Sequence, residues 1–160
     1  MSQRLRAAAL AALSGLAMTA CGNPRPADAT PTGWLRECPG EAFCFSRPAT
    51  LVLQPGQAID SLTARYRGEG VTLVFDMGRY GTSVAHLVKP SQEAALIDGR
   101  PAQVLASEQE IVLIVPKVHE RGGSTVKFSM TLRFEGKPDG KASRETALRI
   151  FQSIEFKPPR

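Results

Sequence analysis

The sequence lacks the signatures of the common enzyme classes and is poor in the residues that usually carry chemistry. Its 160 residues include two histidines, three cysteines and one tryptophan. It has no G-x-S-x-G nucleophile motif and no G-x-x-x-x-G-K-[ST] phosphate loop, and Gly68-Glu69-Gly70 lacks the third glycine of G-x-G-x-x-G. These absences argue against the common hydrolases and nucleotide-dependent enzymes. They favour a protein that is not a catalyst and holds no cofactor.

The chain also has no strong excess of one charge and no biased composition. It carries 20 lysines and arginines against 15 aspartates and glutamates, and Arg4 and Arg6 account for two of the five excess positive charges. So small a net positive charge does not predict nucleic-acid binding. With 42% hydrophobic and 22% charged residues, the composition argues against a disordered, collagen-like or multi-span membrane protein, and the length predicts one domain.

An export signal is present at the N-terminus. Arg4 and Arg6 precede an apolar run over residues 7–20, which is too short to span a bilayer but is typical of a secretory signal. Residues 22–33 follow with three prolines and no apolar periodicity, so we expect an extended tether. The chain thus divides into a signal (1–20), a tether (21–33) and one folded domain (34–160).

The apolar run ends in Met18-Thr19-Ala20-Cys21, which resembles the lipobox of bacterial lipoproteins. The resemblance implies that the Cys21 thiol carries a diacylglycerol and that its amine carries a further acyl chain, which together give stable membrane anchoring. Because Gly22 follows instead of an aspartate, it also implies the outer membrane, with the domain facing the periplasm. The alternative is ordinary signal cleavage after Ala27-Asp28-Ala29, which would discard Cys21.

The two remaining cysteines predict a disulfide. Cys38 and Cys44 flank a short Pro-Gly-containing loop, and export places them in an oxidising compartment. The alternatives are a redox pair or a metal site completed by His86 and His119. The C-x-x-x-x-x-C spacing is not the C-x-x-C of thioredoxin-like or zinc motifs, so we expect a structural bridge.

Apolar patterning predicts several strands followed by one helix. We expect strands at 43–45, 51–53, 59–66, 71–75, 83–88, 102–106, 111–115 and 126–134. The 71–75 segment (VTLVF) has the pattern of a central strand buried on both faces, whereas 126–134 alternates with one apolar face. Asp98-Gly99 predicts a two-residue hairpin turn, and residues 119–123 a polar hairpin loop.

Two segments favour helix. Residues 90–96 combine a proline, a capping serine and good helix formers, which predicts a short helical turn. Ala147, Leu148, Phe151 and Ile154 fall at helical spacing, so we expect a helix from about Lys141 to Ser153 that lies across the sheet. These expectations define an α+β domain with a mostly antiparallel sheet covered by a C-terminal helix.

This arrangement resembles the PsbP-like family. The similarity lies in the hairpin Asp98-Gly99-Arg100-Pro101-Ala102 and in the C-terminal sequence ALRIFQSIEF at 147–156. It implies an α/β/α sandwich over roughly residues 42–157. The family usually has a longer early helix, for which only residues 91–96 are available here, and its members share no catalytic residues that would transfer to this chain.

One loop groups residues that suit a binding site. Asp76, Arg79 and Tyr80 follow the predicted central strand, and side chains at strand ends often carry function. With His119 they form a candidate pocket, although a tight turn in which Asp76 caps the strand is the alternative. His119-Glu120-Arg121 lacks the second histidine of H-E-x-x-H, and no nucleophile motif accompanies His86, so we predict no metal and no catalytic residue.

The sequence therefore predicts a lipid-anchored cell-envelope protein that presents a non-catalytic binding or interaction surface to an envelope protein or polymer. The alternative is a small envelope enzyme or ligand-binding protein that uses a pocket near Asp76, Arg79 and Tyr80.

Overall fold

The computed structural model describes residues 32–56, 60–68, 70–80, 84, 86–136 and 140–158. The predicted signal, the lipobox cysteine Cys21 and most of the tether lie outside these residues. Within the described ranges, no helix is both long and apolar enough to cross a membrane.

The described residues form a mostly antiparallel α+β domain, as predicted. In chain order its elements are β1 (Trp34–Glu37), the 3-10 helix η1 (Pro39–Glu41), β2 (Phe43–Pro48), β3 (Val52–Gln54), β4 (Leu62–Gly68), β5 (Val71–Gly78), β6 (Ser91–Ile97), β7 (Arg100–Ala106), β8 (Glu110–Arg121), β9 (Ser124–Phe134), α1 (Gly140–Gln152) and β10 (Glu155–Phe156).

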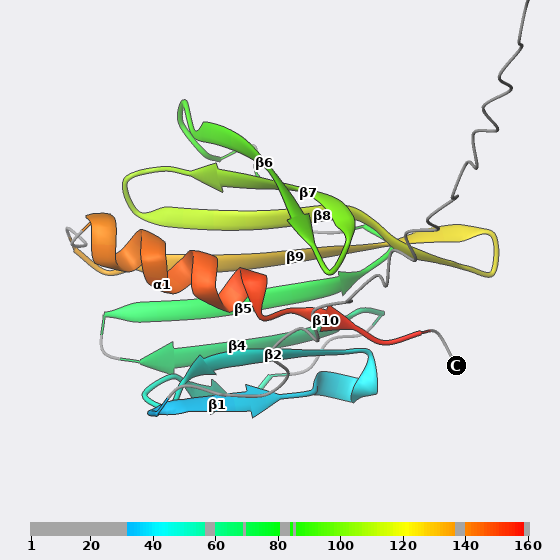
Figure 1. The fold of residues 1–160 in the computed structure, drawn as a ribbon, viewed down its shortest axis with the longest axis horizontal. Helices are drawn as coiled ribbons and strands as arrows, with labels where there is room; N and C mark the ends of the chain where they lie inside the picture. Colours follow the sequence, from blue (N-terminus) through cyan, green and yellow to red (C-terminus); the bar gives the residue numbers. More distant parts are fainter. Residues whose placement is uncertain are drawn as a thin grey trace, which may run out of the picture.

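Two antiparallel sheets contain these strands. The large sheet has seven strands in the order β3-β4-β5-β9-β8-β7-β6, and the small sheet has the order β1-β2-β10. The longest pairing of the large sheet joins β8 to β9. Figure 1 shows the tip of this hairpin, in yellow, projecting past the neighbouring strands. The small sheet is closed by the chain end, because Phe156 of β10 pairs with Phe43 of β2.

An aromatic cluster joins the two sheets. The ring of Phe43 lies 5.0 Å from that of Phe75 and 4.9 Å from that of Phe128, in the edge-to-face geometry that aromatic pairs favour. Phe156 adds a further contact, with its ring 5.2 Å from Phe128. These side chains belong to one buried core that also includes residues of α1.

The helix prediction is confirmed to within one residue at each end. Helix α1 places Ala147, Ile150 and Phe151 in the core with no measurable exposure, and Ile154 follows at 1%. Leu148 is only partly buried and contacts the core from its edge. Figure 1 shows α1, in orange, lying roughly along the line of β9 with the opposite chain direction.

The expectation that residues 71–75 are buried on both faces is wrong. Strand β5 lies inside the sheet between β4 and β9, but its burial alternates. Leu73, Phe75 and Met77 point to the core, while Val74 and Asp76 are partly exposed on the second face. A β-strand turns successive side chains to opposite faces, and only one face of this strand meets the aromatic core.

The structure also corrects two local predictions between residues 83 and 97. The described residues of 83–88 form no strand, and the expected helical turn at 90–96 is strand β6. The Asp98-Gly99 hairpin is confirmed, with φ of 48° and 74° at its two central residues. This turn pairs residues 91–97 along the whole of β7, and the resulting ladder overrides their helix propensity.

The segment that failed to form a strand is held against the second face of the large sheet. His86 Nε2 lies 2.9 Å from an oxygen of Glu110, which begins β8 and is 7% exposed. The other Glu110 oxygen accepts from Arg133 of the neighbouring strand. His86 is therefore a partner of a buried carboxylate and not a sheet residue.

Candidate binding groove

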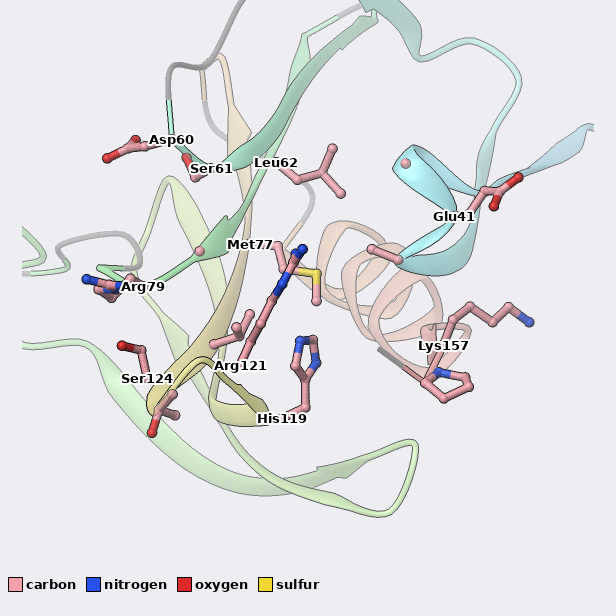
Figure 2. Close-up of a pocket in the computed structure, with 16 residues that line it drawn as sticks. Glu41, Asp60, Ser61, Leu62, Met77, Arg79, His119, Arg121, Ser124 and Lys157 are labelled. Carbon is pink, nitrogen blue, oxygen red and sulfur yellow. The ribbon is translucent and has the colours of Figure 1, made fainter. Parts of the chain in front are cut away.

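A cavity of about 840 Å³ lies where β4 and β5 meet the β8–β9 hairpin and the chain end (Figure 2). Its lining is drawn from five separate parts of the chain: Gly40, Glu41, Ala42, Asp60, Ser61, Leu62, Met77, Gly78, Arg79, His119, Arg121, Ser124, Thr125, Val126, Lys157 and Pro158. We refer to it as the groove. A volume of this size suits a small-molecule ligand.

The groove wall formed by β8 depends on a β-bulge. Val115 pairs with Phe128 but His119 pairs with Val126, so residues 116–118 oppose a single residue of β9. Such a bulge redirects the strand beyond it. His119 and Arg121, two residues apart, then face the same side, as the strand repeat requires.

The turn of this hairpin is tighter than the sequence indicated. The polar loop expected at 119–123 is only Gly122-Gly123, whose φ values of 57° and 73° suit a two-residue turn. His119 and Arg121 are strand residues, and Arg121 pairs directly with Ser124. Both side chains are thereby held on a paired backbone and not on a loop.

The opposite wall comes from the antiparallel ends of β4 and β5. Leu62 pairs with Met77, which places both apolar side chains in the groove. Gly78 is required next, because a Cβ there would lie 2.7 Å from Ser61 Cβ. This close approach brings residues 60–61 beside Arg79.

A disulfide holds the third side. Cys38 and Cys44 are bonded, as predicted, and the residues between them form η1. Gly40, at a φ of 54°, and Glu41 line the groove from this short loop. Ala42 O accepts a hydrogen bond of 2.8 Å from the backbone N–H of Lys157, so the same loop also fixes the end of the chain.

The groove contains two arginines whose charge is not neutralised nearby. Arg79 and Arg121 form no ion pair or side-chain hydrogen bond with any residue that the structure describes. Six other arginines, at positions 36, 47, 67, 100, 133 and 144, are paired with carboxylates. The groove arginines therefore remain available to an anion.

Glu120, the acidic residue before Arg121, forms its ion pair and hydrogen bond with other side chains. Lys117 lies 2.9 Å from Glu120, and the Thr125 hydroxyl donates to the same carboxylate at 3.0 Å. These hydrogen bonds lower the pKa of Glu120, which stays ionised but is already partnered. His119 adds a polar atom without a described partner, because its Nδ1 is buried and forms no hydrogen bond with the residues that the structure describes.

The structure brings together two of the four residues predicted for the site. Arg79 and His119 line the groove, whereas Asp76 and Tyr80 do not. Asp76 points to the second face of the sheet, where its Oδ1 is buried and has no hydrogen-bond partner within the described ranges, and Tyr80 is 77% exposed. Sequence reasoning missed Arg121, although it stands in the His119-Glu120-Arg121 motif that was tested only for zinc.

The side chains of the groove suit an anion better than a metal ion. Among the described residues, no three histidine, cysteine, aspartate or glutamate side chains are grouped as metal ligands. Arginine instead suits carboxylates and phosphates, which it can bind with two parallel hydrogen bonds. No family model, curated protein or solved structure matches this chain, so its function has to be inferred from the residues themselves.

Proposed function

We propose that this chain is a lipid-anchored cell-envelope protein whose folded domain is a binding module. The lipobox-like Met18-Thr19-Ala20-Cys21 and the proline-containing stretch after it support an anchor followed by a tether. The Cys38–Cys44 disulfide supports an oxidising compartment. The glycine at position 22 favours the outer membrane, with the domain facing the periplasm.

The proposed architecture is a PsbP-like sandwich in which α1 covers one face of the large sheet. The Asp98-Gly99 hairpin supports this proposal, and so do the buried α1 residues Ile150 and Phe151, which share one core with β8 and β9. An exposed apolar sheet face requires a covering layer, and α1 is the long amphipathic element available within the described residues.

The groove is the proposed binding surface. The observation that carries this proposal is that Arg79 and His119, distant in sequence, line one cavity together with the unpaired Arg121. Both arginines are exposed, so an anion that enters the groove can reach them.

Binding is favoured over catalysis by the surroundings of His119. A nucleophile and its base lie within hydrogen-bond reach of each other in the common covalent mechanisms. In the part of the chain that the structure describes, no serine, threonine or cysteine side chain hydrogen-bonds to His119, and Thr125 donates to Glu120. A partner or ligand that is held unchanged accounts for these residues better than a reaction does.

Photocrosslinking in intact cells tests the groove. A photoreactive amino acid at Ser124 lies in the groove wall, and one at Thr63 lies on an exposed strand position outside it. We expect irradiation to give a defined adduct, detected by intact-protein mass spectrometry, at Ser124 only. Equal adducts at both positions, or none at Ser124, would contradict the proposal.

A further inference from the structure

The groove has an apolar floor and a positively charged wall, and one kind of ligand can bind both. Its floor is apolar, with Met77 7% exposed and Leu62 and Val126 partly buried. Figure 2 shows the Arg121 side chain reaching from the hairpin toward Met77 at the middle of the cavity, with the His119 ring beside it. A guanidinium and apolar side chains therefore line the same cavity.

The charge balance of the lining favours an anion. The lining contains three cations, Arg79, Arg121 and Lys157. It contains two carboxylates, those of Glu41 and Asp60. Figure 2 shows Lys157 directed away from the middle of the cavity, and its Nζ lies 4.0 Å from Glu155. The central positive charge is then that of Arg121, which has no described partner, with Arg79 at the far side of the cavity in the same view.

We propose that the groove binds a small amphiphilic anion, with the apolar body over Leu62, Met77 and Val126 and a carboxylate or phosphate at Arg121. This inference rests on the groove being the binding surface, as proposed above, and adds the class of ligand. The unbranched, flexible side chain of Met77 suits a floor that adapts to an alkyl or aromatic body. The planar guanidinium of Arg121 suits an oxyanion held by two hydrogen bonds.

His119 is a second polar residue of the groove wall. Its ring lies on the same strand face as Arg121, and its Nδ1 is a buried atom without a hydrogen-bond partner among the described residues. Buried polar atoms are nearly always satisfied in native proteins. This nitrogen has no exposed surface, so a ligand group supplies its missing hydrogen bond only when the His119 ring turns toward the cavity.

A dye displacement assay tests the ligand class. The full chain with Cys21→Ser is used, because removing the lipid-bearing thiol avoids detergent. Anilinonaphthalene sulfonate, which is itself an apolar anion, serves as the fluorescent probe and is titrated with octanoate, octyl phosphate or octanol. We expect both anions to displace the probe and the neutral alcohol to be roughly tenfold weaker, since it lacks the charge-assisted hydrogen bonds. The stronger of the two anions distinguishes a carboxylate from a phosphate.

Two variants in the same background make the assay specific. Arg121→Gln removes the central charge, and Arg65→Gln removes an exposed arginine on β4 that has no described partner and lies outside the groove. We expect Arg121→Gln to weaken the probe and both anions about tenfold while octanol is unchanged, and Arg65→Gln to alter none of them. Circular dichroism confirms that each variant is folded.

The outcomes separate this inference from the proposed function. Octanol that competes as well as octanoate, or an Arg121→Gln variant that binds both anions as tightly as the parent, overturns the anion assignment. A Ser124 photoadduct in cells would then still support the groove as a binding surface. A roughly tenfold loss of affinity for the probe and both anions in Arg121→Gln but not in Arg65→Gln supports the amphiphilic anion.

Discussion

Glu110 is a carboxylate held almost out of water on the second face of the large sheet, opposite the aromatic core. Burial by itself raises the pKa of Glu110, but hydrogen bonds from His86 and Arg133, together with their charge, outweigh it and lower the pKa below its usual 4.5. The residue therefore stays ionised, and its two partners attach His86 and β9 to the start of β8.

This lowered pKa makes stability depend on pH. A group whose folded-state pKa lies below its unfolded value stabilises the fold fully above the unfolded pKa, and the effect is lost as the pH falls through the folded pKa. We expect Glu110→Gln to reduce the free energy of unfolding at neutral pH by about 1–3 kcal/mol. The difference from wild type should shrink in acid, below about pH 4.5.

Urea unfolding from pH 7 to pH 3 checks this, with Glu108→Gln as the matched control because Glu108 is an exposed neighbour. A difference between wild type and Glu110→Gln that stays constant over the whole range would contradict the assigned role.

At the scale of the elements, α1 places Ala147, Ile150 and Phe151 in the core. Phe151 has no exposed surface, so Phe151→Ala leaves a cavity and should cost about 3–5 kcal/mol. For a domain of this size, the melting temperature should fall by roughly 10–20 °C. Glu145→Ala, on the exposed side of the same helix, is the control and should melt near wild type. A Phe151→Ala protein that melts within a degree or two of wild type would make α1 peripheral.

Elements with local signals could be predicted from the sequence. The Asp98-Gly99 turn needs positive φ at both central residues, and those two residue types tolerate it. The alternation of 126–134 and the helical spacing around Phe151 each describe one buried face, and both elements form as expected. In each case the decisive information lies within a dozen residues.

Elements decided by distant partners could not be predicted. Residues 91–97 include good helix formers, yet they form a strand. Their backbone pairs with β7 along its whole length, and this pairing stabilises the strand more than helix propensity stabilises a helix. The residues of the candidate site likewise include some that the sequence identifies and some that only the fold brings together. Arg79 was found from its place after a strand, whereas Asp60 and Lys157 reach the groove only through the topology.

For the whole molecule, the anchor and the core are expected to be independent, because Cys21 precedes the first residue of the domain. We expect Cys21→Ser to leave a folded domain but to release it from membranes. Cell fractionation followed by a salt wash and detergent extraction measures this, with the wild-type chain as control. A Cys21→Ser protein that remains with membranes after the salt wash would refute the lipid anchor.

The pairing of β10 with β2 joins residues more than 100 positions apart, and it determines when the domain can finish folding. A chain still passing through a ribosome tunnel or an export pore has no β10, so the Phe43–Phe156 contact cannot form. The β8–β9 hairpin, with its two-residue turn, can form early, because its contacts are local. Completion of the small sheet instead requires closing a very long loop, so this step follows the emergence of β10.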